Sequence, residues 1–150
     1  PQQPQQGTTG GATCLSGAPN EVWCFGEEDY EICKKYMFLR ERLRPMLYEE
    51  AKACVKEGRP MMAHLCLDFP DDEQALACGD EYLLGRRLLV APIVYPGAEG
   101  RKVYLPQGRW RHFFTGRVCE GGRPVELPCP LNEALVFERE EEQQPWSFAT

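Results

Sequence analysis

The sequence predicts an α+β chain in which a helical piece is followed by a β-rich piece. Apolar residues recur every three or four positions across residues 27–57, which is the period of an amphipathic helix. From Leu88 onward, short apolar runs alternate with Gly- and Pro-containing turns at intervals of about 8–12 residues, which is typical of an antiparallel β-sandwich. We therefore expect a helix-plus-strand piece at residues 23–84 and a β-sandwich at residues 85–138.

The two ends of the chain carry no such pattern. Residues 1–22 are rich in Pro, Gln, Gly, Thr and Ser and lack periodicity, so we expect a loop or disordered segment. Residues 139–150 continue a charged run, which predicts a solvated tail. The opening PQQPQQ has neither the basic nor the apolar region of a signal peptide, which favours a cytoplasmic location.

The predicted helix has clear start and stop signals. Acidic residues fill its first turn, where they meet the positive end of the helix dipole, and Gly58 and Pro60 end it. Pro45 lies inside and should kink the helix, because proline lacks an N–H donor. A helix of about 30 residues is longer than usual for a small domain and fits one wall of a larger barrel. Its apolar stripe consists of Ile32, Tyr36, Leu39, Leu43, Leu47 and Ala51.

The β-rich piece is preceded by one isolated apolar run. Residues 60–67 are short, apolar and continuous, which predicts a strand buried on both faces. An acidic turn at 68–72 and a short helix at 73–78 should follow. Beyond them, six short strands are expected at residues 88–94, 101–105, 109–114, 117–119, 125–127 and 134–138.

Composition limits the classes of partner. The formal net charge of −6 disfavours binding to nucleic acid or to anionic lipid, and no apolar run is long enough to span a membrane. None of the eight cysteines has the CxxC spacing of a zinc motif, and His64 and His112 stand alone, so we expect no metal site and no cofactor. Several cysteines replace core residues, which predicts mostly reduced, buried thiols, with a disulfide framework as the minority alternative.

Five segments, taken in order, resemble glycoside hydrolase family 31, which contains α-glucosidases and α-xylosidases. They are PNEVWCFG at 19–26, the helix signature Arg42, Pro45, Leu47 and Tyr48, then GRPMMAHLCLDFPDD at 58–72, YLLGRRLLVAPIV at 82–94 and VYLPQGRWRHFFTG at 103–116. Ala63 departs from the arginine that the family usually has after its Met-Met pair.

The resemblance implies a specific architecture and activity. Residues 23–84 would be the last helix and strand of a (β/α)8 barrel, and the proximal β-sandwich would follow. The parent protein would be a retaining α-glycosidase that binds an α-linked oligosaccharide or glycoside and hydrolyses α-glucosides or α-xylosides. The family's catalytic aspartates lie in motifs absent from this chain, so we expect the chain alone to be inactive. The alternative is a non-catalytic accessory protein, or a protein- or carbohydrate-binding module.

Few residues of this chain are candidates for a site. Asp68, Asp71 and Asp72 follow a predicted strand, but a turn and a helix start need such residues as caps, and we favour that role. Trp23 and Phe25 could stack on a sugar ring or pack at the start of the helix, and they are the substrate-binding candidates.

The remaining expectations concern the two histidines and the apolar stripe of the helix. We expect His64 to be a hydrogen-bonded core residue and His112 to be exposed on a hairpin. The apolar stripe of the helix, without the barrel strands, predicts self-association of the isolated chain.

Overall fold

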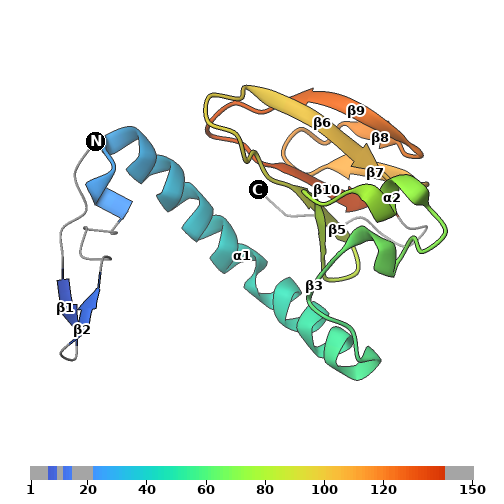
Figure 1. Ribbon diagram of the computed structural model, residues 1–150, viewed down its shortest axis with the longest axis horizontal. Helices are drawn as coiled ribbons and strands as arrows, with labels where there is room; N and C mark the ends of the chain where they lie inside the picture. Colours follow the sequence, from blue (N-terminus) through green and yellow to red (C-terminus); the bar gives the residue numbers. More distant parts are fainter. Residues whose placement is uncertain (1–6, 10–11, 15–21, 141–150) are drawn as a thin grey trace. The chain divides into compact units, whose positions relative to one another are not determined.

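The computed structural model describes residues 7–9, 12–14 and 22–140. It confirms an α+β chain with antiparallel sheets (Figure 1). The chain divides into two compact units, residues 1–44 and 45–150, each of which is described by itself. The expected boundary between residues 84 and 85 lies between β4 and β5, which are neighbouring strands of one sheet in the second unit.

In the first unit, part of the expected loop is a β-hairpin. Strands β1 (Gly7–Thr9) and β2 (Ala12–Cys14) pair antiparallel, with Gly7 opposite Cys14. Two glycines separate these strands in the sequence, which is a hairpin signal that the expectation of a loop at 1–22 overlooked. Residues 1–6, 10–11, 15–21 and 141–150 lie outside the described residues.

A short 3-10 helix, η1 (Val22–Cys24), precedes the long helix α1 (Glu27–Glu57), whose extent agrees with the sequence pattern. The helix runs without interruption through Pro45. At its C-terminus the Arg59 amide donates to the Cys54 carbonyl at 2.8 Å, and Gly58 has a φ of +67°, as expected of a glycine that ends a helix.

Burial along α1 differs from the predicted stripe. The stripe residues are half-buried, and the fully buried positions lie four residues apart in the second unit, at Met46, Glu50 and Cys54. No residue between 22 and 44 is buried within the described part of the chain. Only the last third of α1 therefore contributes to a core.

The second unit contains two sheets (Figure 1). The six-stranded sheet has the order β3-β4-β5-β10-β7-β8, and every pair is antiparallel. Its strands are Met62–Ala63, Tyr82–Leu84, Leu88–Ala91, Leu135–Arg139, Arg109–His112 and Val118–Glu120, in that order. The second sheet pairs β6 (Gly100–Leu105) with β9 (Arg123–Pro128).

The two sheets share one hydrophobic core. Its largest fully buried side chains are Trp110 and Phe137 from the six-stranded sheet, and Val103 and Leu105 come from β6. The buried Trp110 Nε1–H donates to the Pro106 carbonyl at 2.8 Å, so its one polar group is satisfied. The six strands expected from residue 88 onward are all present.

The expected strand at 60–67 is wrong except at two of its residues. Only Met62 and Ala63 pair, as β3, and a 3-10 helix, η2 (Leu65–Leu67), follows. The cause is His64, whose Nδ1 accepts from the Cys66 amide at 3.2 Å and so caps η2 in place of continuing the strand. Strand β4 was not expected, although it pairs with both β3 and β5.

The turn between β4 and β5 receives a buried acid from α1. Glu50 is 5% exposed, and its Oε2 accepts from the Arg86 amide at 2.9 Å while Oε1 accepts from Arg86 Nη2 at 2.9 Å. Burial opposes ionisation of Glu50, but the hydrogen bonds and charge of Arg86 outweigh it and lower the pKa of this carboxyl. Gly85, at φ +65°, gives the carboxylate room.

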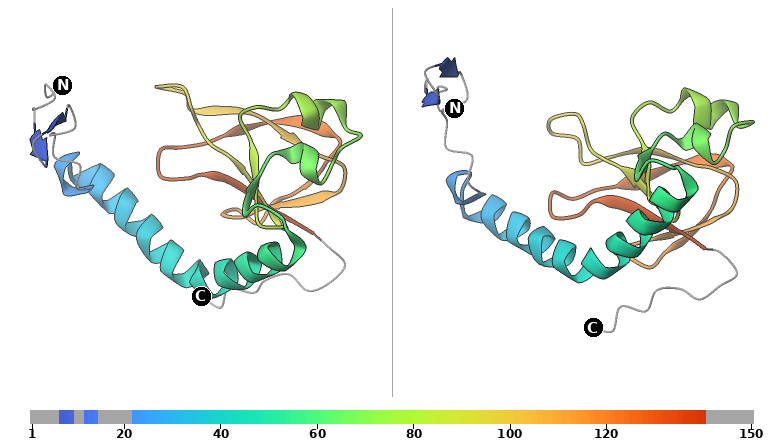
Figure 2. Two further views of the ribbon diagram at one scale, coloured as in Figure 1. Left: turned by 60° about the horizontal axis from the view of Figure 1, so that its bottom comes forward. Right: turned by 90° about the horizontal axis from the view of Figure 1, so that it is seen from below.

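The second unit also contains one short α-helix after the acidic turn. Helix α2 (Glu73–Ala77) follows the acidic turn, and in both views of Figure 2 the green segment that carries it lies beside the strands of the second unit. No helix within the described residues is both long and apolar enough to cross a membrane.

We expect Gly85→Ala to destabilise the chain more than Gly97→Ala. Both glycines have positive φ, which costs an alanine about 1–2 kcal/mol. A Cβ at Gly85 would also lie 2.8 Å from Glu50 Oε2, whereas one at Gly97 meets nothing within 4 Å. Crowding of this kind adds about 1–3 kcal/mol. Urea unfolding of both variants measures the difference, and equal losses would contradict a role for the Glu50 contact.

Candidate functional site

The acidic turn after η2 lines an open depression of about 590 Å³. It contains Asp68, Asp71 and Asp72, for which the sequence favours a structural role over a catalytic one. Residues of the turn, of α2, of β6, of the β6–β7 turn and of the β8–β9 turn surround it: Asp68, Phe69, Pro70, Asp71, Asp72, Glu73, Gln74, Tyr104, Gln107 and Gly122. The structure thus brings the three candidate aspartates to one surface.

Asp68 is held by an arginine. Its Oδ1 accepts from Arg59 Nη1, and both side chains are only 14% exposed. Arg59 Nη2 also donates to the Gly85 carbonyl at 3.1 Å, so the guanidinium links the acidic turn to the β4–β5 turn. A carboxylate fixed by a half-buried ion pair is a poor nucleophile or proton donor, and this geometry favours a structural role.

Asp72 caps α2, as the sequence predicts. Its Oδ1 accepts from the amides of Gln74 and Ala75 at 3.0 and 3.1 Å, and its Oδ2 accepts from Tyr104 Oη at 2.6 Å. Burial works against the charged form, but these hydrogen bonds, led by that of Tyr104, lower the pKa of the Asp72 carboxyl. Asp71, next to it, is exposed.

Trp23 and Phe25 lie in the first unit, at the start of α1. Their side chains are 68% and 59% exposed. Neither is buried by packing against α1 within the described residues, so both aromatic faces are accessible in this unit.

Both histidines differ from their expected environments. His64 is an exposed cap residue and not a core residue. His112 is 5% exposed, because it lies on the inward face of β7, where its ring packs beside Phe137 at 5.1 Å between ring centroids. Burial lowers the pKa of His112. Trp110, two residues earlier on the same strand face, was the signal for this inward orientation.

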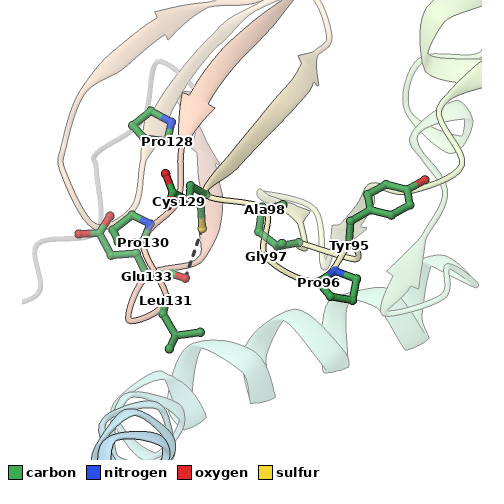
Figure 3. Close-up of a pocket in the computed structure, with 11 residues that line it drawn as sticks. Tyr95, Pro96, Gly97, Ala98, Pro128, Cys129, Pro130, Leu131 and Glu133 are labelled. Atoms are coloured by element: carbon green, nitrogen blue, oxygen red, sulfur yellow. Dashed lines mark hydrogen bonds between the residues drawn. The ribbon is translucent and has the colours of Figure 1, made fainter.

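A larger hollow of about 820 Å³ lies between the β5–β6 and β9–β10 loops, and sequence reasoning missed it (Figure 3). Cys129 Sγ donates to the Glu133 carbonyl at 3.4 Å within it. The lining is mainly proline and aliphatic carbon, which suits apolar packing better than proton transfer: Ile93, Tyr95, Pro96, Gly97, Ala98, Glu99, Pro128, Cys129, Pro130, Leu131 and Glu133.

One group of side chains has the composition of a metal site. The ligand atoms of Cys78, Asp80 and Glu81 lie within 4.8 Å of one another, between α2 and β4. Burial, together with the nearby charge of Glu81, raises the pKa of Cys78 to about 12, and burial raises the pKa of Glu81 to about 7. The Cys-x-Asp-Glu spacing is not a zinc motif, which is why the expectation of no metal did not consider it.

The other thiols fit the expectation of core cysteines in part. Cys54, Cys119 and Cys129 are buried and free, whereas Cys33 and Cys66 are free but only half-buried.

We expect Asp72→Ala to lower the free energy of unfolding by about 1 kcal/mol through loss of the helix cap, while Asp71→Ala, on the exposed neighbour, changes it little. The folded-state pKa of Asp72 lies below its ordinary value of 3.8. Its stabilisation is therefore full above that value and is lost as the pH falls through the folded-state pKa. Urea unfolding at about pH 7 and about pH 3 checks this; a deficit that persists in acid would contradict it.

Comparison with known proteins identifies the family. Residues 58–142 match the glycosyl hydrolase family 31 C-terminal domain. Alpha-glucosidase 2 of Bacillus thermoamyloliquefaciens is 41% identical over 117 residues, which are 78% of this chain and 15% of that protein. The alpha-xylosidase of Saccharolobus solfataricus is 34% identical over 122 residues, 81% of this chain and 17% of that protein.

Solved structures agree with the sequence relatives. A family 31 alpha-xylosidase from a soil metagenome, complexed with xylose, has a TM-score of 0.78 and 40% identity over 93% of this chain and 21% of its own. The Flavobacterium johnsoniae family 31 dextranase, complexed with glucose, has a TM-score of 0.79 and 35% identity. The match covers 83% of this chain and 16% of the dextranase. The chain thus spans 15% to 21% of these four relatives. It belongs to glycosyl hydrolase family 31, as a segment that includes the family's C-terminal domain.

Proposed function

We propose that this chain is the C-terminal part of a retaining α-glycosidase that hydrolyses α-glucosides or α-xylosides. The observation that carries the proposal is the match of residues 58–142 to the family 31 C-terminal domain. Two of its relatives are an alpha-glucosidase and an alpha-xylosidase several times its length. Within such an enzyme, the chain supports the catalytic domain and supplies no catalytic pair.

The acids of the turn support this division of labour. Retention needs two carboxyl groups about 5–5.5 Å apart across the scissile bond, one as nucleophile and one as acid. Asp68 is engaged by Arg59, and Asp72 by α2 and Tyr104. We place the nucleophile and the acid in a part of the parent enzyme outside this chain.

We further propose that α1 and the segment around β3 are the last helix and strand of the parent's (β/α)8 barrel and that strands β5 to β10 form its proximal β-sandwich. The support is the large apolar surface on α1. Each such side chain that stays in water loses roughly 1.5–3 kcal/mol of burial free energy. In the parent enzyme, barrel strands would bury these side chains. In the isolated chain, a second copy would bury them. The exposed side chains are Met37, Phe38, Tyr48 and Val55.

The isolated chain should show no turnover of aryl α-glucosides or α-xylosides, because Asp68 and Asp72 are both engaged in contacts that maintain the fold. A release assay with purified protein checks this, and the Asp68→Asn and Asp72→Asn variants are the controls. Turnover that remains after purification and disappears in either variant would contradict the proposal that the chain lacks a catalytic pair.

We propose that Trp23 and Phe25 contact the substrate in the parent enzyme. Their exposed aromatic faces suit the apolar C–H faces of sugar rings. In the full-length enzyme, Trp23→Ala should raise KM for an aryl α-glycoside about tenfold, since one lost apolar contact is worth about 1–3 kcal/mol.

Tyr95→Ala is the matched control for this substitution, because Tyr95 is an aromatic residue of the β5–β6 loop that is 74% exposed and lies outside the helix. Equal effects of the two substitutions on KM, or an unchanged KM in Trp23→Ala, would contradict the proposal that Trp23 contacts the substrate. Tight binding of isomaltotriose to the isolated chain would instead favour the alternative of a carbohydrate-binding module.

A further inference from the structure

The segment between α2 and β4 contains an unsatisfied buried carboxylate oxygen. The Glu81 side chain is 2% exposed, and its Oε2 has no hydrogen-bond partner among the described residues. A buried polar atom without a partner is destabilising and points to a missing ligand or ion. The Cys78 thiol and the Asp80 and Glu81 carboxylates each have a ligand atom within 4.8 Å of the others.

Arg101 holds the other oxygens of the two carboxylates. Its Nη2 lies 2.7 Å from Asp80 Oδ2 and 3.3 Å from Glu81 Oε1, and the latter oxygen also accepts from the Tyr104 amide at 2.8 Å. Arg101 is itself fixed, because Nη1 donates to the carbonyls of Asp80 and Pro92 at 3.2 and 2.7 Å. Partners that orient a carboxylate through one oxygen and leave the other for an ion are typical of protein metal sites.

We propose that Cys78 Sγ, Asp80 Oδ1 and Glu81 Oε2 bind a divalent cation of borderline softness such as Zn²⁺, with water as the fourth ligand. Cys78 Sγ lies 3.7 Å from Asp80 Oδ1. Two ligands of a tetrahedral zinc, at about 2.3 Å for sulfur and about 2.0 Å for oxygen, are about 3.5 Å apart. Asp80 is half exposed, so its side chain is able to adjust.

The ligand set and the local charge both favour this class of ion. Thiolate sulfur binds Zn²⁺ well, whereas Mg²⁺ and Ca²⁺ prefer an all-oxygen set. A thiolate and two carboxylates carry three negative charges, which the ion and the Arg101 guanidinium balance. A neutral group of charges is less costly to bury than an unpaired carboxylate.

The bound ion would join the segment after α2 to the arginine of β6, so it would act on the stability of the second unit. This inference is independent of the proposed glycosidase function, since it concerns neither the substrate candidates Trp23 and Phe25 nor the acidic turn.

Co²⁺ is the probe for the test, because a cobalt–thiolate bond has its own ultraviolet charge-transfer absorption. Titrated into the purified chain, Co²⁺ should produce that absorption at one ion per chain, and Zn²⁺ should abolish it and raise the midpoint of thermal unfolding. Cys78→Ser should remove the absorption. Asp80→Asn should weaken the affinity by about tenfold or more, because it removes one anionic ligand.

Cys66→Ser and Asp71→Asn are the matched controls, a half-buried cysteine and an exposed aspartate outside the group. Both should bind Co²⁺ as the unchanged chain does. An unchanged chain without the absorption, a Cys78→Ser variant that retains it, or an Asp80→Asn variant of unaltered affinity would each overturn the proposal. The partly exposed Asp80 keeps the test valid even if Cys78→Ser folds poorly.

Discussion

The turn at Gly85 and Arg86 is the point on which the second unit depends. Glu50 of α1 accepts from the Arg86 amide and side chain, Arg59 donates to the Gly85 carbonyl, and the Gly85 amide donates to the Met61 carbonyl at 2.7 Å. A buried carboxylate is tolerated only when it is paired and hydrogen-bonded, so this turn is both the reason that Glu50 can be buried and the means by which the helix end is joined to the sheet.

Arginines elsewhere in this unit hold acidic side chains in the same way. Arg87 Nη2 lies 3.1 Å from Glu138 Oε1 across the β5–β10 pair, Arg59 holds Asp68, and Arg101 reaches Asp80 and Glu81. Each guanidinium has several donors in a fixed plane and so connects more than one element. The acids that look catalytic in the sequence are therefore parts of the structure, which agrees with a supporting role for this segment in a larger enzyme.

Sequence reasoning succeeded where local signals decide the outcome. The strands after Leu88 are bounded by Gly and Pro turns, and α1 by its acidic first turn and Gly58, so both were predictable. It failed where a side chain competes with the backbone pattern or where the inward face of a strand was assigned wrongly. His64 caps η2 and ends β3, and His112 faces inward with Trp110 because side chains two residues apart share a strand face. The role of Arg101 was also invisible, because its partners are about 20 positions away along the chain.

Burial of the His112 imidazole makes the stability of the fold depend on pH. Burial is the main cause of its lowered pKa, with the charge of Arg117 acting in the same direction and that of Glu133 against it. The unfolded chain therefore binds a proton at a pH where the folded chain does not. The stabilisation is complete above the ordinary value of 6.5 and is lost as the pH falls through the folded-state pKa. Protonation of His112 in mild acid therefore puts a positive charge beside the rings of Phe114 and Phe137, which pack against the imidazole.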